Sequence, residues 1–133
     1  MRREGFKTGK WNWELDKQNT YELRKIIKRY GWPGKKLVGK KGAQSVWLLA
    51  QHTPNLSFQK RCLLLYEQAV QKNDAEIKYL AYLKDRVLVR KGKKQIYGTQ
   101  FKINLKTRKK KLFPLKYPRK VNLLRAEVRL DPM

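Results

Sequence analysis

The sequence predicts a mainly α fold, a compact bundle of four to five helices with a small β-hairpin in the C-terminal third. Two patterns lead to this prediction. Apolar residues recur at spacings of three and four along most of the chain, as they do on one face of a helix. Residues 101–105 instead alternate with the period of two that is typical of a strand. The length of 133 residues fits one hydrophobic core.

The N-terminal segment differs from the rest of the chain. Residues 1–18 carry Phe6, Trp11 and Trp13 without helical spacing. We interpret this segment as a basic and aromatic N-terminal arm that precedes a single helical domain at residues 19–133.

The first helix is expected to begin at a cap formed by Asn19 or Thr20, because their side chains accept hydrogen bonds from the free amides of a first turn. One apolar face follows, formed by Leu23, Ile26, Ile27 and Tyr30. The segment Gly31-Trp32-Pro33-Gly34 is expected to end the helix, and a lysine-rich loop follows it.

Three further helices are expected in the middle of the chain. The second, at about 42–52, is apolar on all sides over Val46–Ala50, which predicts a central, buried helix. The third, at about 57–72, has an apolar stripe formed by Phe58, Cys62, Leu65, Tyr66 and Ala69. The fourth, at about 75–89, is expected to end before a glycine and to place five residues inward: Ile77, Leu80, Ala81, Val87 and Leu88.

The C-terminal third changes character. A strand is predicted over 101–105, then a basic turn over 107–111 and a short returning strand over 112–115. A last helix is expected at about 119–129, because its apolar positions again have spacings of three and four.

The charge of the chain points to a polyanionic partner. The chain has 34 Lys and Arg against 10 Asp and Glu, a net charge of +24. The excess is uneven, because residues 21–60 have a net charge of +8 and residues 91–133 of +12, whereas residues 61–90 have +2. Self-repulsion on this scale opposes folding, and a partner of opposite charge relieves it. We therefore expect contact with nucleic acid, RNA in preference to DNA, or with another polyanion, and one setting for it is a ribonucleoprotein.

The two basic regions supply the predicted contacts. Their Lys and Arg side chains are expected to bind phosphates, with aromatic residues Tyr97, Phe101 and Tyr117 placed between them to stack on bases. The predicted nucleic-acid-binding residues are Arg24, Lys25, Lys28, Arg29, Lys35, Lys36, Lys40, Lys41, Lys93, Lys94, Lys102, Lys106, Arg108, Lys109, Lys110, Lys111, Arg119 and Lys120.

Several other classes of protein receive no support from the sequence. No apolar stretch approaches the roughly 20 residues of a membrane span. The N-terminus has no apolar segment of a secretory signal, so we expect a cytoplasmic protein or one exported by a leaderless route. One cysteine, Cys62, allows no intramolecular disulfide. We predict no cofactor and no metal, because one His and one Cys cannot form a zinc site without carboxylates from elsewhere. The oligomeric state is left open.

An enzymatic alternative rests on polar residues in apolar segments. If His52 and Asp85 pair, the carboxylate orients the imidazole and raises its pKa, which suits a general acid or base of a ribonuclease or toxin-like domain. The other predicted catalytic residues are Arg86, Tyr97 and Gln100. The predicted substrate-binding residues are Gln51, Gln95 and Thr99. The same residues also suit a structural network that holds helices together.

The polar segments also resemble a bacterial domain-of-unknown-function family over residues 19–133. The resemblance rests on four signature motifs, Gly-Trp-Pro, Gln-His, Asp-Arg and Gln-x-Tyr-Gly-Thr-Gln. The matching segments, which contain these motifs, are Gly31-Trp32-Pro33, Leu37-Val38-Gly39, Gly42-Ala43, Trp47-Leu48-Leu49-Ala50-Gln51-His52, Phe58-Gln59, Ala81-Tyr82-Leu83-Lys84-Asp85-Arg86-Val87, Gly92-Lys93-Lys94-Gln95-Ile96-Tyr97-Gly98-Thr99-Gln100, Pro114-Leu115 and Leu124-Arg125-Ala126-Glu127-Val128. It implies a mostly helical fold.

The resemblance also implies a pocket that includes the polar signature residues, so a small-molecule site inherited from the family is a third hypothesis. The chain departs from the family pattern in two places. Family members often have acidic residues where this chain has Thr53-Pro54-Asn55, and before the last helix, where it has Lys116-Tyr117-Pro118-Arg119-Lys120. The second departure changes an acidic rim into a basic one, which favours an anionic partner for this member.

Overall fold

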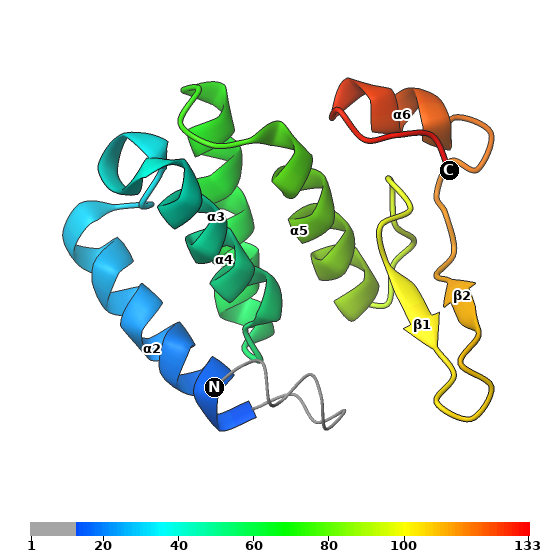
Figure 1. Cartoon of the computed structure of the whole chain (residues 1–133), viewed down its shortest axis with the longest axis horizontal. Helices are drawn as coiled ribbons and strands as arrows, with labels where there is room; N and C mark the ends of the chain where they lie inside the picture. Colours follow the sequence, from blue (N-terminus) through cyan, green and yellow to red (C-terminus); the bar gives the residue numbers. More distant parts are fainter. Residues whose placement is uncertain (1–12) are drawn as a thin grey trace. The chain divides into compact units, whose positions relative to one another are not determined.

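The structure of the protein, a computed structural model, describes residues 13–133. Within them, five helices, α2 to α6, and one two-stranded antiparallel sheet form a mainly α protein, as predicted (Figure 1). The chain forms two compact units, one ending at Cys62 and one running from Leu63 to Met133. Among residues 13–133, no helix combines the length and apolar composition needed to cross a membrane. The division into an arm and a single domain stays a prediction, and Phe6 and Trp11 lie outside the described residues.

Helix α2, Trp13–Tyr30, begins before the predicted cap. Glu14 and Asp16 lie in its first turn, where acidic side chains interact favourably with the free amides and the helix dipole. Thr20 lies inside the helix, and its hydroxyl donates to the Asp16 carbonyl at 2.8 Å. The predicted start at Asn19 or Thr20 is therefore wrong, and residues 13–18 are helical.

The buried face of α2 is narrower than predicted. Leu23 and Ile27 are buried, whereas Ile26 and Tyr30 are exposed. The helix ends at Gly31, which has a φ of 76° and donates its N–H to the Ile27 carbonyl at 2.8 Å. Glycine adopts this left-handed conformation without the strain that a side chain brings.

Helix α3, Lys35–His52, contains the predicted second helix and part of the segment expected to be a loop. Gly39, with a φ of 77°, interrupts it. The expectation of a helix buried on all sides is wrong. Only Ala50 and Gln51 are fully buried in α3, and Leu48 is 37% exposed.

Helix α4, Leu56–Gln71, agrees closely with the prediction. Asn55 caps it, because its side-chain Oδ1 accepts the N–H of Phe58 at 2.9 Å. Four of the five residues predicted to point inward are buried: Phe58, Cys62, Tyr66 and Ala69.

Helix α5, Ile77–Arg90, is buried to a greater extent than α3, the helix for which burial was expected. None of its residues from Tyr79 to Arg90 is exposed, although several carry charged side chains. The long aliphatic parts of Lys and Arg can lie along apolar surface while the charged group stays in water. The buried residues of α5 are Ala81, Leu83, Asp85 and Val87.

The C-terminal hairpin consists of β1, Phe101–Ile103, and β2, Lys110–Leu112. The strands pair antiparallel, with Phe101 opposite Leu112, Lys102 opposite Lys111 and Ile103 opposite Lys110. The returning strand thus begins inside the segment predicted as a basic turn. Helix α6, Val121–Glu127, is shorter than predicted. Within this unit, the tip of the hairpin points away from α6 (Figure 1).

Candidate nucleic-acid interface

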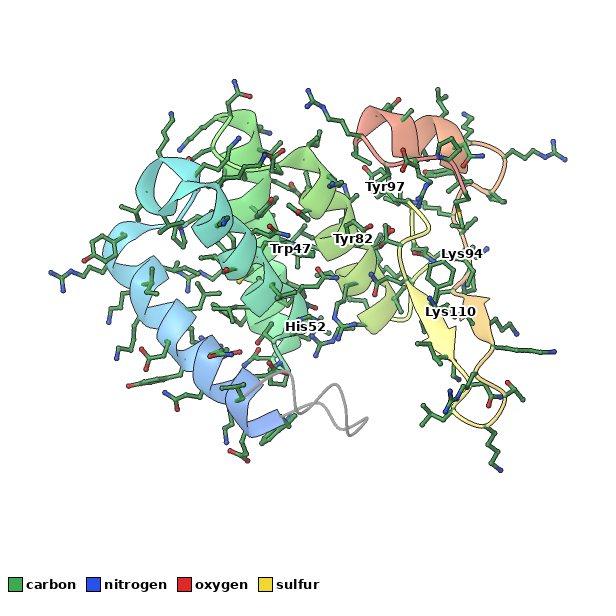
Figure 2. All side chains as sticks on the ribbon, in the orientation of Figure 1. Trp47, His52, Tyr82, Lys94, Tyr97 and Lys110 are labelled. Atoms are coloured by element: carbon green, nitrogen blue, oxygen red, sulfur yellow. The ribbon has the colours of Figure 1, made fainter. Side chains whose placement is uncertain are left out.

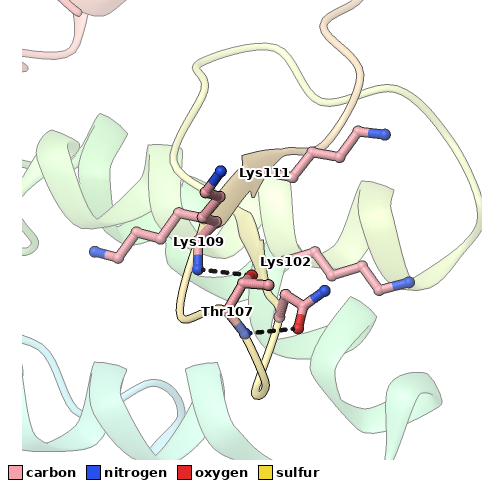
Figure 3. A pocket seen from close by; sticks show the side chains of 6 residues that line it. Lys102, Thr107, Lys109 and Lys111 are labelled. Atoms are coloured by element: carbon pink, nitrogen blue, oxygen red, sulfur yellow. Dashed lines mark hydrogen bonds between the residues drawn. The ribbon is translucent and has the colours of Figure 1, made fainter.

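Two lysines face each other across the hairpin. Lys102 and Lys111 are direct partners in the strand register, and both are exposed. Direct partners of an antiparallel pair lie on the same face of the sheet, and Figure 3 shows the two side chains extending in the same direction. Like charges in this position destabilise a hairpin. An anion bound between the two ammonium groups removes that repulsion.

The loop between the strands holds further cations on an ordered backbone. Asn104 Oδ1 accepts the N–H groups of Lys106 and Thr107 at 2.9 and 3.2 Å. Arg108 has a left-handed φ of 59° and donates its N–H to the Asn104 carbonyl at 2.7 Å. The Lys109 N–H donates to Thr107 Oγ1 at 3.4 Å (Figure 3). An open pocket here is lined by Lys102, Asn104, Thr107, Lys109, Lys110 and Lys111.

Apolar side chains are also exposed on the hairpin, and Phe101 and Ile103 lie on the face opposite to Lys102 and Lys111. Phe101, Ile103 and Leu105 are 44, 54 and 89% exposed. The Lys110 ammonium lies 6.0 Å from the centre of the Phe101 ring. Tyr117, further along the chain, is also exposed. Exposed aromatic rings beside cations are typical of surfaces that bind unpaired bases and their phosphates.

The charge of this region is not balanced within the sequence. Residues 86–126 contain 15 Lys and Arg and neither Asp nor Glu. All six cations of the hairpin are exposed, as are the other predicted contacts of the same unit, Lys93, Lys94, Arg119 and Lys120. These exposed cations attract a polyanion over a distance of about one Debye length, ~8 to 10 Å in physiological salt.

The predicted basic residues of the first unit lie on α2 and α3. All except the half-buried Lys35 are exposed: Arg24, Lys25, Lys28, Arg29, Lys36, Lys40 and Lys41. Several of them make contacts inside the protein, including Arg29, whose guanidinium lies 5.4 Å from the centre of the Tyr30 ring. The Arg24 guanidinium lies 4.6 Å from the centre of the Phe58 ring, and Lys25 Nζ lies 3.6 Å from a carboxylate oxygen of Glu22. Lys35, Lys36, Lys40 and Lys41 lie on a helix and not in the predicted loop.

The buried Asp85 carboxylate organises the loop between α5 and β1. Its Oδ1 accepts the N–H groups of Ile96 and Tyr97 at 2.8 and 3.1 Å. Its Oδ2 accepts the N–H and the hydroxyl of Thr99 at 3.1 and 2.9 Å. Both oxygens are therefore engaged by donors of the loop. This use of Asp85 stabilises backbone amides that would otherwise be buried without acceptors.

Gln95 joins the same loop to the chain that follows β2. Its side-chain Nε2 donates to the carbonyls of Gln100 and Phe113 at 3.0 and 2.9 Å, and its Oε1 accepts the Gln100 N–H at 2.9 Å. The side-chain Nε2 of Gln100 in turn donates to Thr99 Oγ1 at 3.2 Å. The structure thus brings together Asp85 with Gln95, Thr99 and Gln100. Their hydrogen bonds position the start of β1 and hence the basic hairpin.

Arg125 supports this loop and was not predicted as a site residue, although it lies in one of the shared motifs. Its Nη1 donates to the Tyr97 carbonyl at 2.8 Å and its Nε donates to the Asp131 carbonyl at 2.6 Å. Tyr97 and Tyr82, both labelled in Figure 2, pack against the buried apolar cluster of Ala81, Val128 and Leu130. Burial raises the pKa of the Tyr97 hydroxyl. Arg86 is half-buried on α5.

His52 and Gln51 lie in the last turn of α3, in the first unit. The His52 Nδ1 lies 3.1 Å from the Leu48 carbonyl oxygen. The Gln51 carbonyl accepts a hydrogen bond at 3.0 Å from the fully buried Gln59, another residue that was not predicted. Asp85 belongs to the second unit, so its pairing with His52 stays a prediction.

Metal-ligating residues are not clustered in the described part of the chain. Among residues 13–133, no group of three or more His, Cys, Asp or Glu side chains is placed to hold a metal ion. Cys62 is buried, and burial raises the pKa of its thiol to about 12. A thiol with this pKa stays protonated at neutral pH and is a weak nucleophile and metal ligand.

Comparison with known proteins gives one match. Residues 11–133 match the Family of unknown function (DUF6624). The predicted resemblance to a domain-of-unknown-function family is confirmed, and the match begins before residue 19. No curated protein and no solved structure shows significant similarity to the chain.

Proposed function

We propose that this chain, which belongs to the Family of unknown function (DUF6624), binds single-stranded RNA through the hairpin of β1 and β2. The observation that carries the proposal is the exposed, directly opposed pair Lys102 and Lys111. Two like charges held together weaken the isolated hairpin, and a phosphate between them converts that repulsion into two attractive contacts. The basic surfaces of α2 and α3 can add contacts to other phosphates.

The exposed aromatic ring favours a single strand over a duplex. Phe101 can stack on a base only if that base is unpaired and accessible. RNA provides such bases in loops, bulges and ends, whereas cellular DNA is mostly duplex. RNA is therefore the preferred partner, in free form or as part of a ribonucleoprotein.

The size of the electrostatic contribution follows from counterion release. Each phosphate contact to a single strand changes the slope of log affinity against log salt by about −0.7. At roughly 0.1 M salt, one contact thus contributes about fivefold in affinity, and two contacts contribute about 25-fold.

The test measures fluorescence anisotropy of a labelled oligouridylate with the intact protein after removal of bound nucleic acid. The test variant is Lys102→Gln/Lys111→Gln, and the matched control is Lys72→Gln/Lys78→Gln, which removes two exposed lysines of the same unit outside the hairpin. We expect the test variant to lose about 25-fold in affinity and about 1.4 in salt slope. Equal affinities for the two variants would overturn the role of the hairpin.

The enzymatic alternative has less support. A general acid or base needs its orienting carboxylate, and the Asp85 oxygens accept hydrogen bonds from the loop at residues 96–99. The same RNA, analysed by gel after incubation with the protein, distinguishes the two functions. Binding predicts full-length RNA, whereas fragments that disappear with His52→Ala would favour a ribonuclease.

A further inference from the structure

An exposed stripe of aromatic rings and cations runs along α2 in the first unit. Its members follow one another at spacings of four, four, three and four residues, which places them on the same side of a helix. Each of the last four comes directly after a buried residue of α2, so the stripe lies about 100° around the helix axis from the buried face. The members of this α2 stripe are Trp13, Lys17, Tyr21, Arg24 and Lys28, and all of them are exposed.

The two rings of the α2 stripe are accessible, and each has a cation beside it. Trp13 and Tyr21 are 53 and 58% exposed. Their positions are separated by about 12 Å along the helix axis, so each ring can contact a different base. Lys17 Nζ lies 5.1 Å from the centre of the Trp13 ring, and Lys25 Nζ lies 5.2 Å from the centre of the Tyr21 ring. An open pocket of about 420 Å³ between the rings is lined by Glu14, Lys17, Gln18 and Tyr21.

The acidic residues of α2 leave the positive charge of the stripe in place. Asp16 is buried, and a carboxylate oxygen of Glu22 lies 3.6 Å from Lys25 Nζ. Glu14 lies in the first turn of the helix, beside the pocket. The C-terminal half of the stripe therefore carries the charge that attracts phosphates.

The composition of the stripe favours an unpaired nucleic acid over a membrane surface. Aromatic rings next to cations bind single strands, because a base stacks on the ring while its phosphate contacts the cation. A helix that lies in a membrane surface instead buries a broad apolar face. The α2 stripe contains no aliphatic residue, and three of its five members are charged.

We infer that the α2 stripe is a second contact surface for single-stranded RNA. Unpaired bases stack on Trp13 and Tyr21, and the adjoining phosphates contact Lys17 and Lys28. The surface accepts any base, because every base has a face that can stack on an aromatic ring. This inference rests on the proposed RNA binding and adds a contact surface in the first unit.

The test compares Tyr21→Leu with a matched control, Tyr30→Leu. Both tyrosines belong to α2, both are 58% exposed, and Tyr30 also has a cation beside its ring, the Arg29 guanidinium at 5.4 Å. Nine residues correspond to about 2.5 turns, so Tyr30 lies on the side of the helix opposite to Tyr21. Leucine favours a helix more than tyrosine does, and circular dichroism should show unchanged helix content in both variants.

The affinities are measured by fluorescence anisotropy with a labelled oligouridylate. Tyr21→Leu should lose about fivefold or more in affinity, because stacking of one base on an aromatic ring contributes on this scale. Tyr30→Leu should bind like the unchanged protein, and so should Tyr21→Phe, which keeps the ring. The salt slope of Tyr21→Leu should not change, because no phosphate contact is removed. An abasic oligomer of the same length should bind equally to all of these proteins, since it has phosphates but no base to stack.

The outcomes separate this inference from the role of the hairpin. If Tyr21→Leu binds oligouridylate as tightly as Tyr30→Leu does, or loses the same affinity for the abasic oligomer, the stacking surface is overturned. Loss of binding to phosphatidylglycerol vesicles with RNA affinity unchanged would identify a membrane contact and also overturn it. The hairpin is judged separately, by Lys102→Gln/Lys111→Gln. If no RNA binds at low salt, both the proposed function and the inference fail.

Discussion

Replacement of Lys102 by Glu should strengthen the hairpin and weaken RNA binding in the same protein. Lys102 lies directly opposite Lys111, and both side chains are exposed. In Lys102→Glu, the repulsive pair becomes an ion pair across the two strands. If the two lysines are present to bind phosphate, stability and affinity must change in opposite directions.

The stability effect can be estimated from the cross-strand pair. Pairs of opposite charge contribute about 0.2 to 1 kcal/mol, and directly opposed like charges have the opposite effect. With solvent screening of exposed side chains, we expect the substitution to stabilise the hairpin by about 0.5 to 1 kcal/mol. The equilibrium constant for local opening should then fall about two- to fivefold.

The affinity effect has the opposite sign. One lost phosphate contact costs about fivefold at roughly 0.1 M salt, and the new carboxylate adds repulsion, so we expect a loss of at least about fivefold.

Two assays on the same sample measure these effects. Hydrogen exchange of the Asn104 amide reports hairpin opening, because its N–H donates to the Lys109 carbonyl at 3.0 Å across the hairpin. Anisotropy with oligouridylate reports affinity. The control is Lys78→Glu, the same charge change at an exposed residue of α5 outside the hairpin. The reasoning is refuted if Lys102→Glu binds RNA as well as Lys78→Glu does, or if its Asn104 amide exchanges faster than in the unchanged protein.

Three further predictions concern stability and reactivity. Asp85→Asn should lower the free energy of unfolding in urea by about 2 to 4 kcal/mol, since loop amides lose a charged acceptor; a change near zero would contradict the role of the carboxylate. Gly98→Ala should cost about 1 to 2 kcal/mol in the same assay, because its φ of 70° is left-handed, and unchanged stability would contradict this. The Cys62 thiol, with a pKa of about 12, should react slowly with a thiol reagent at neutral pH and quickly in urea, and equal rates would show that it is not protected.

The helices of the middle of the chain could be predicted because their spacing reflects one buried face. Helix α4 has its cap at Asn55 and buries Phe58 and Cys62 as the pattern indicates. The start of α2 could not be found in this way. Thr20 looks like a cap in the sequence, but in the structure its hydroxyl lies 2.6 Å from Thr53 Oγ1, a contact between residues far apart in the chain.

The sequence did not predict correctly which helices are buried, because the apolar content of a helix does not determine how much of its surface other elements cover. Residues 46–50 form the most apolar helical run, yet Leu48 is exposed. Helix α5 contains Lys84, Arg86 and Arg90, and none of these is exposed. A hydrophobic pattern shows which face of a helix prefers to be buried, but not how much of the remaining surface its neighbours cover.

The polar cluster could be located but not interpreted from the sequence. Asp85, Gln95 and Thr99 were grouped as site residues, and the structure places them together. Their hydrogen-bond partners include backbone groups of residues 96–100 and Phe113, which a sequence does not display. Arg125 was overlooked for the same reason, because it contacts main-chain carbonyls.

The central claim, that the uncompensated charge of residues 86–126 binds single-stranded RNA, is tested most directly by the salt dependence of binding. The measurement is the affinity of the intact, nucleic-acid-free protein for an unstructured RNA oligomer across a salt series. Three to six phosphate contacts predict a straight line of log affinity against log salt with a slope of about −2 to −4. Absence of binding at low salt, or affinity that does not change with salt, would contradict the claim.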